Sequence, residues 1–252
     1  MHLFAFVCVG LYTVMSATVG VRLIKRAIPN RHVPEILMGT AYLLAPGLGY
    51  PMVVIGSALP ERTAGLLMFC AGQVLIVMGC TCFFFFNARV FRPGVVYAQA
   101  AAALGAILLA IAASEITRGQ LALGAGSIGL ASVSAASVTM LTVLGLAYGW
   151  TAYEGFRHNR MMRRRAAVGL GDSVVANRFL LWAIAGSVQF VSDLVAAHSL
   201  QMGGNMTVDV GPVLATALAG VCNSALLVLI FMPPARYVRW LLRDPQGALA
   251  PS

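Results

Sequence analysis

Long apolar stretches alternate with short polar ones along most of the chain. Seven windows are apolar over about 20 residues, the length that an α-helix needs to cross a hydrocarbon core of about 30 Å. They lie at approximately 3–24, 34–56, 63–86, 95–113, 128–153, 178–200 and 212–232. Backbone groups in lipid must pair within their own segment, and the alternating strands of a barrel are missing from this sequence. The pattern therefore predicts seven membrane-spanning helices.

The composition agrees with this pattern. Of the 252 residues, 60% are hydrophobic and 10% are charged, whereas a soluble domain carries about 25% charged residues. The mean hydropathy is +0.85. We therefore predict an all-α polytopic integral membrane protein with one domain over 1–252, including a short cytoplasmic tail over 233–252. The loops are too short for an effector domain, which needs about 100 residues.

The net charge of +9 is explained by membrane topology and does not require a nucleic-acid partner. The basic residues fall almost entirely into the segments that follow spans one, three, five and seven. Those on this side are Arg22, Lys25, Arg26, Arg31, Arg89, Arg92, Arg157, Arg160, Arg163, Arg164, Arg165, Arg178, Arg236, Arg239 and Arg243. Only Arg62 and Arg118 lie on the other side. Because basic residues collect in cytoplasmic loops, this asymmetry predicts an N-out, C-in orientation.

Two short matches indicate an internal repeat. Residues 88–92 (ARVFR) at the end of span three match 235–239 (ARYVR) after span seven, and 20–22 (GVR) matches 155–157 (GFR). These matches predict a 3+1+3 parallel repeat with span four as the linker. That layout is similar to the one in the SWEET family of sugar transporters, although spans one and five lack the prolines of that family. The resemblance concerns architecture and implies solute transport.

Several kinds of chemistry are disfavoured. A retinal protein needs a lysine in helix seven, and the sole lysine, Lys25, follows span one. The histidines His2, His32, His158 and His198 are scattered over both sides of the membrane, so they cannot form one metal centre. No hydrolase motif occurs, and the five cysteines lie inside apolar segments, which indicates no disulfide framework. We predict no cofactor and no metal, and the sequence favours a protein that is not an enzyme.

Asp193 is the strongest candidate for a functional residue. An ionisable side chain inside a bilayer is unfavourable by about 2.5–3.5 kcal/mol, so such residues mark ion, proton or ligand sites. No basic residue lies in a span at the same depth to neutralise it. Gln189 is four residues earlier and so shares its helix face. Asp193 is either a proton, cation or ligand site, or a carboxyl that ties helices together or reaches the outer surface.

Two amide side chains, Gln73 and Asn223, are placed near the midplane on spans three and seven. Together with Gln189 they predict a polar layer inside the bundle. Each has an alternative interpretation as a hydrogen-bonding contact between helices, because small residues flank both positions.

Span two contains the segment 46–51 (PGLGYP), which cannot be regular α-helix throughout. Irregular backbone at membrane depth lines a cavity or is buried in protein. We therefore predict a kink or break that opens outward beside Asp193, with Tyr50 as a further candidate for ligand binding. A packing kink near the outer interface is the alternative.

The longest loop is expected between spans five and six, over Glu154 to Asn177, and it is basic. Arg160, Arg163, Arg164 and Arg165 are candidates for contact with anionic lipid headgroups, each contributing about 1 kcal/mol at such a surface. The alternative is that these charges only set the topology. The preference for arginine over lysine and the many alanines indicate a bacterium of high genomic GC content, and hence a bacterial inner membrane.

These observations favour a transporter of a small solute, coupled to ions or protons, with an outward-facing polar pocket at Asp193, Gln189, Gln73, Asn223 and Tyr50. The alternative is a seven-helix ligand sensor, or a noncatalytic accessory or structural subunit that acts through a partner protein. The lipid bilayer is the expected environment, and a protein partner or homo-oligomer is compatible with either function.

Overall fold

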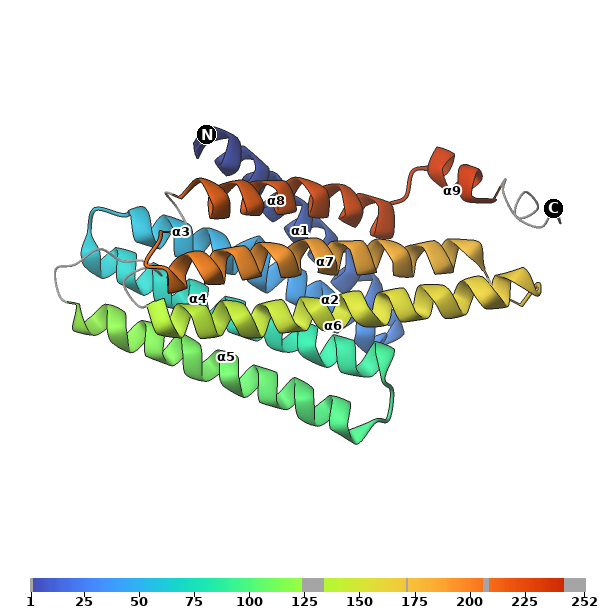
Figure 1. Ribbon diagram of the computed structural model, residues 1–252, viewed down its shortest axis with the longest axis horizontal. Helices are drawn as coiled ribbons and strands as arrows, with labels where there is room; N and C mark the ends of the chain where they lie inside the picture. The colour runs from blue at the N-terminus through green and yellow to red at the C-terminus, as the bar shows by residue number, and fades with distance from the viewer. Residues whose placement is uncertain (1, 124–133, 171, 206–208, 243–252) are drawn as a thin grey trace.

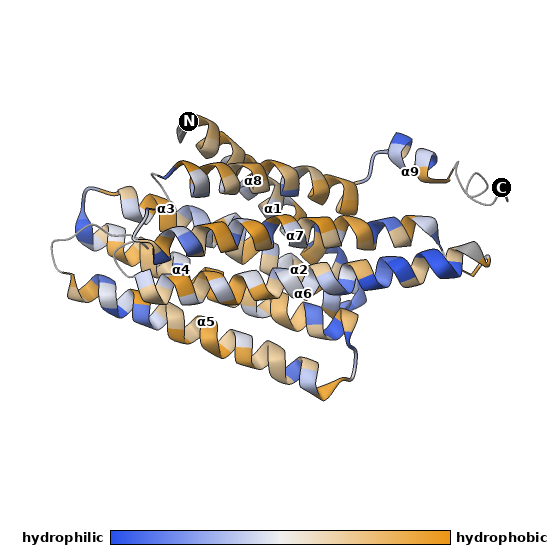
Figure 2. Ribbon diagram, in the orientation of Figure 1, coloured by the Kyte–Doolittle hydropathy of each residue, from blue (hydrophilic) through white to orange (hydrophobic). Residues whose placement is uncertain are grey.

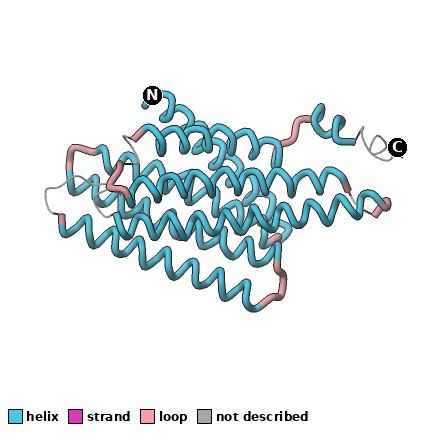
Figure 3. Tube along the Cα trace, in the orientation of Figure 1, coloured by secondary structure: helices cyan, strands magenta, loops and turns pink. Residues whose placement is uncertain are grey.

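The computed structural model describes residues 2–123, 134–170, 172–205 and 209–242. Every regular element in these ranges is helical, and no strand occurs among them (Figure 3). The elements are α1 (His2–Asn30), α2 (Val33–Tyr42), the π-helical segment η1 (Leu43–Gly49), α3 (Tyr50–Ala58), α4 (Arg62–Phe91), α5 (Val96–Ala122), α6 (Ser134–Ala167), α7 (Ser173–Gln201), α8 (Val210–Phe231) and α9 (Ala235–Leu242). The predicted all-α class is confirmed.

Seven of these helical stretches are long and apolar enough to cross a membrane. Six are single helices, and the second span, Val33–Ala58, is built from α2, η1 and α3 in succession. The seven predicted spans are therefore confirmed as helices, and the chain is a multi-pass membrane protein by this measure. Residues 128–133 of the predicted fifth span, and 243–252 of the tail, lie outside the described residues.

One predicted boundary is wrong. The stretch from Glu154 to Asn177 was expected to be a loop because it is rich in arginine. Instead α6 continues to Ala167, since arginine, methionine and alanine are all good helix formers. The helix ends just before Gly169, which adopts a φ of 72° that favours glycine.

The seven spans lie along one bundle (Figure 1), and their contacts follow a closed ring. Each spanning helix packs against the next one along the chain, and α1 packs against α8 to close the ring. Successive helices run in opposite directions along the long axis of the bundle. This arrangement leaves an interior that several helices can line together.

The two ends of the bundle differ in polarity (Figure 2). The hydrophilic residues of α6 gather at its C-terminal part, which extends past the neighbouring helices. We call this the basic end; α1, α4, α6 and α8 all finish there. The outer faces between the two ends carry exposed apolar side chains such as Phe6, Leu67 and Ile111. An apolar belt of this kind suits contact with lipid.

The irregular segment predicted in span two is present, and it takes the form of a π-helix. Pro46 lies inside η1, and α3 continues directly from it, so the span is widened without being interrupted. Close packing holds the segment in place: a Cβ built on Gly49 would lie only 2.8 Å from the carbonyl oxygen of Gly72 on α4. π-Helical segments of this kind occur frequently at functional sites.

Candidate functional site

Asp193 belongs to a chain of hydrogen bonds between α7 and α8. Gln189 Nε2 donates to Asp193 Oδ1 at 2.9 Å, across one turn of α7. Asn223 Nδ2, on α8, donates to Gln189 Oε1 at 3.0 Å. The structure thus brings three of the predicted site residues together, in the order Asn223, Gln189, Asp193.

Some polar atoms at this site have no protein partner. Asp193 is only 7% exposed, yet among the described residues no hydrogen-bond partner is found for its Oδ2 atom. The same holds for Oδ1 of Asn223 and for Oε1 of Gln73, whose residue is 2% exposed. Buried polar atoms normally have a partner, so unpartnered ones indicate a bound water, ion or ligand.

A cavity of about 180 Å³ lies beside Asp193. Its lining comes from every spanning helix except α5, and it occupies the half of the bundle remote from the basic end. The lining side chains that carry polar groups are Tyr12, Thr13, Tyr50, Gln73, Ser137, Tyr148, Gln189, Ser192, Asp193 and Thr216, together with the thiol of Cys80. The remaining lining residues are apolar or glycine. A mostly apolar cavity with a few converging polar groups is typical of a small-molecule site.

Of the predicted site residues, Asp193, Gln189, Gln73 and Tyr50 all line this cavity. Tyr50 stands at its exposed margin, whereas Gln73 is buried on α4. Asn223 instead lines a second, much smaller cavity of about 20 Å³ that shares Tyr12 and Tyr148 with the larger one. Sequence reasoning missed these two tyrosines, because tyrosine in an apolar span gives no signal that separates lining from packing.

Aromatic side chains fill the bundle between the larger cavity and the basic end. The aromatic layer consists of Tyr42, Phe83, Phe86, Tyr148, Trp182 and Phe231. Its rings touch in sequence, from Tyr148 to Phe83 at 5.0 Å between centroids and from Phe86 to Trp182 at 5.6 Å. Trp182 also meets Phe231 edge to face at 5.6 Å. Such contacts add about 0.5–1.5 kcal/mol per pair beyond burial, so the layer helps to hold these helices together, with the smaller cavity among its rings.

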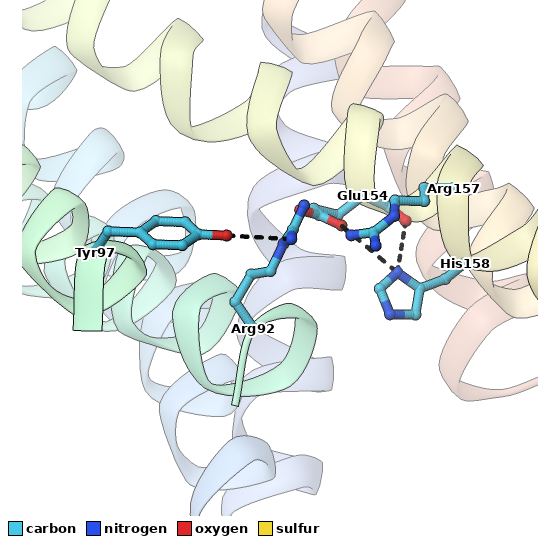
Figure 4. Close-up of polar contacts among 5 residues, drawn as sticks. All are labelled: Arg92, Tyr97, Glu154, Arg157 and His158. Atoms are coloured by element: carbon cyan, nitrogen blue, oxygen red, sulfur yellow. Dashed lines mark hydrogen bonds and ion pairs between the residues drawn. The ribbon is translucent and has the colours of Figure 1, made fainter. Parts of the chain in front are cut away.

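A second buried carboxylate, Glu154 of α6, lies beyond this layer (Figure 4). It is 1% exposed, and Arg92 Nε donates to its Oε1 at 2.5 Å. Arg157 Nη1 donates to its Oε2 at 3.3 Å, and His158 Nδ1 lies 3.8 Å from the same oxygen. Tyr97 accepts a hydrogen bond from Arg92 Nη1. The hydrogen bond to Glu154 raises the pKa of Arg92 above its ordinary value.

Glu154 was not among the predicted site residues, since it was placed at the start of a loop. The signal that could have found it is helical spacing: Arg157 and His158 follow at three and four residues, on the same helix face. One turn earlier, the hydroxyl of Thr151 donates to Asn87 Oδ1 at 3.0 Å, and both residues are buried. These contacts join α4 to α6 near the basic end.

The predicted lipid-contact residues Arg160, Arg163, Arg164 and Arg165 are all exposed on the C-terminal extension of α6. They lie far along the helix from the cavity, toward the basic end. Their contact with headgroups stays a prediction.

No group of three or more metal-binding side chains occurs in the part of the chain that the structure describes. Comparison of the chain with models of protein families, with curated proteins and with solved structures gives no match.

Proposed function

We propose that this chain is a membrane transporter for a small solute, with Asp193 as the residue that binds the solute or a coupling ion. The observation that carries the proposal is the cavity of about 180 Å³ with the unpartnered Oδ2 of Asp193 beside it. A carboxylate within a membrane span that has no compensating base marks ion or substrate pathways. The cavity supplies the space that such a pathway needs.

The aromatic layer supports the same proposal. A transporter must close one side of its binding site while the other is accessible, and the layer separates the cavity from the basic end. The ion pair between Glu154 and Arg92 joins α6 to the end of α4 beyond that layer. In this proposal the structure corresponds to a state closed at the basic end, and a return step would separate these contacts.

The orientation is part of the proposal. With the basic end in the cytoplasm, the cavity lies toward the outside, in what we expect to be a bacterial inner membrane. Cysteine introduced at Arg160 should then be labelled only from the cytoplasmic side, and cysteine at Asn205 only from the outside. The opposite labelling pattern would overturn the orientation and, with it, the outward placement of the cavity.

The 3+1+3 repeat stays a prediction. The two matching segments differ in structure. Residues 88–92 form the C-terminal end of α4, whereas 235–239 belong to α9, a separate helix after the turn that follows α8. Superposing α1 to α4 on α6 to α8 tests it: the prediction requires Arg89 to fall on Arg236. If the two sets of spans have unrelated arrangements, the repeat is lost as support for transport.

Transport is tested with purified protein in liposomes. Small solutes are added outside while uptake and internal pH are followed, the latter with a pH-sensitive dye. We expect at least one solute to enter in a protein-dependent way, and Asp193→Asn to stop its entry. Glu115→Gln is the matched control, because it also removes one carboxylate but lies exposed on α5. Protein-independent entry of all solutes would contradict the proposal.

A second candidate is a ligand sensor or accessory subunit that acts through a partner protein. The extension of α6 and the amphipathic helix α9 favour it, because both present exposed arginines beyond the bundle. Asn177 Nδ2 on α7 donates to the hydroxyl of Tyr237 on α9 at 2.6 Å, which ties the two helices together. Ligand binding without any flux would favour this candidate. Binding of anionic lipid to the detergent-solubilised protein, compared between wild type and the variant with Arg163→Gln and Arg164→Gln, tests whether anionic lipid contributes.

A further inference from the structure

We infer that the cavity beside Asp193 binds a small organic cation, a protonated amine about as large as one aromatic ring. This inference names a ligand class for the proposed transport site and in that sense rests on the proposed function. It depends on three independent features of the site: the direction of its hydrogen bonds, its uncompensated charge, and its size and lining.

The chain of hydrogen bonds at Asp193 leaves acceptor atoms without a partner. An ionised Asp193 can only accept, so Gln189 must turn its Nε2 toward it and its Oε1 toward Asn223. Asn223 must then use its Nδ2, which leaves its Oδ1 unpartnered. With Oδ2 of Asp193 and Oε1 of Gln73, the unpartnered atoms are all oxygens. A ligand that donates hydrogen bonds therefore fits these oxygens.

The negative charge of the Asp193 carboxylate is also uncompensated. Among the described residues, no lysine or arginine lines either the larger or the smaller cavity. The carboxylate of Glu154, in contrast, is compensated, because two arginines contact it. A buried carboxylate that lacks such a partner is stabilised when a cationic ligand enters. A positively charged donor therefore fits better than a neutral one.

The size and lining select an organic cation over a metal ion. An apolar protein cavity of about 150 Å³ holds benzene, and this cavity is slightly larger, at about 180 Å³. The lining has a single carboxylate and much of it is apolar, whereas a hard divalent cation is bound chiefly by several charged or carbonyl oxygens. Apolar side chains such as Ile76 and Met140 suit a hydrocarbon group, and Tyr12 and Tyr148 supply aromatic rings that attract cations.

The experiment compares benzylamine, which is protonated at neutral pH, with benzyl alcohol, a neutral compound of nearly the same shape. Binding to the purified full chain in nanodiscs is measured by calorimetry and by the shift in melting temperature. We expect benzylamine to bind and benzyl alcohol to bind at least about tenfold more weakly, because a charge-assisted hydrogen bond contributes about 1.5–3 kcal/mol. Asp193→Asn should weaken benzylamine binding by about 10- to 100-fold, and Glu115→Gln should leave it unchanged.

Equal binding of the two compounds, equal benzylamine binding by wild type and Asp193→Asn, or no binding of either compound would each overturn the inference. If Asp193→Asn does not fold, the comparison of benzylamine with benzyl alcohol on the wild-type protein still tests whether the cavity prefers a cation. Liposome flux separates this inference from the proposed function. Benzylamine binding without flux of any solute upholds the ligand class and contradicts transport. Flux of neutral solutes without benzylamine binding upholds transport and contradicts the ligand class.

Discussion

Two buried carboxylates of this protein have opposite surroundings. Glu154 lies toward the basic end, and Arg92, Arg157 and His158 surround it. Asp193 lies beside the larger cavity, with one amide donor on Oδ1 and no protein partner for Oδ2 among the described residues. The two are similarly inaccessible, at 1% and 7% exposure. Burial alone therefore does not distinguish a structural carboxylate from one available to a ligand.

The difference lies in what neutralises each charge. The carboxylate of Glu154 is compensated within the protein, so its contribution is the joining of α4 to α6. The carboxylate of Asp193 is not compensated within the protein. It can therefore form a favourable interaction with a ligand that enters the cavity. We therefore expect substitutions of Glu154 to affect stability mainly, and substitutions of Asp193 to affect ligand-dependent activity mainly.

The largest expected effect on stability comes from Glu154→Ala. It removes a buried carboxylate that accepts charge-assisted hydrogen bonds from two partly exposed arginines, which lowers the free energy of unfolding by about 2–4 kcal/mol. Asp193→Ala, the matched truncation, should lower it by less than about 1 kcal/mol, because only the bond from Gln189 is lost. Thermal unfolding in detergent compares the two. A larger loss from Asp193→Ala would remove the distinction between the carboxylates.

Gln189→Leu is expected to have the next largest effect. It removes the side chain that connects Asn223 to Asp193, and so leaves a buried donor and acceptor unsatisfied, at a cost of about 1–3 kcal/mol. Gln189→Glu keeps the shape but brings two carboxyls together, and it should be destabilising at high pH only. Melting temperatures at two pH values test this, and an unchanged Gln189→Leu protein would show that the chain of hydrogen bonds is unimportant.

Thr151→Val should have a smaller effect on stability than Glu154→Ala or Gln189→Leu, about 0.5–1.5 kcal/mol. It removes the hydrogen bond to Asn87 on the Glu154 side of the aromatic layer, while the shape of the side chain is kept. Solute uptake in liposomes should be unchanged, because neither residue lines the larger cavity. A loss of uptake that matches Asp193→Asn would mean that the polar residues beyond the aromatic layer belong to the site.

Much of this fold could be predicted from the sequence, because the hydropathy of about 20 consecutive residues is enough to identify a membrane span. The pairing of Asp193 with Gln189 also follows, since a spacing of four residues places two side chains on one helix face. The bond from Asn223 to Gln189 joins residues 34 apart. Depth in the membrane predicted that both would lie in one layer but could not predict that they touch.

The missed features all depend on contacts between helices or on where a helix ends. Hydropathy assigned Glu154 to a loop because charged residues follow it, although those residues continue α6 and supply its partner Arg157. Tyr12 and Tyr148 were missed for another reason: an aromatic residue in an apolar span has the same local pattern whether it faces lipid, core or cavity. Only the order of helices around the ring decides which of them meet.

The most direct test of the central claim is solute flux through liposomes containing Asp193→Asn, measured together with the melting temperature of that variant. Asparagine keeps the volume of the side chain and can still hydrogen-bond to Gln189, so folding should be preserved. The account predicts a melting temperature close to that of the wild type and a loss of solute-dependent flux. Unaltered flux in the folded Asp193→Asn protein would contradict the claim that this carboxylate is the binding or coupling site.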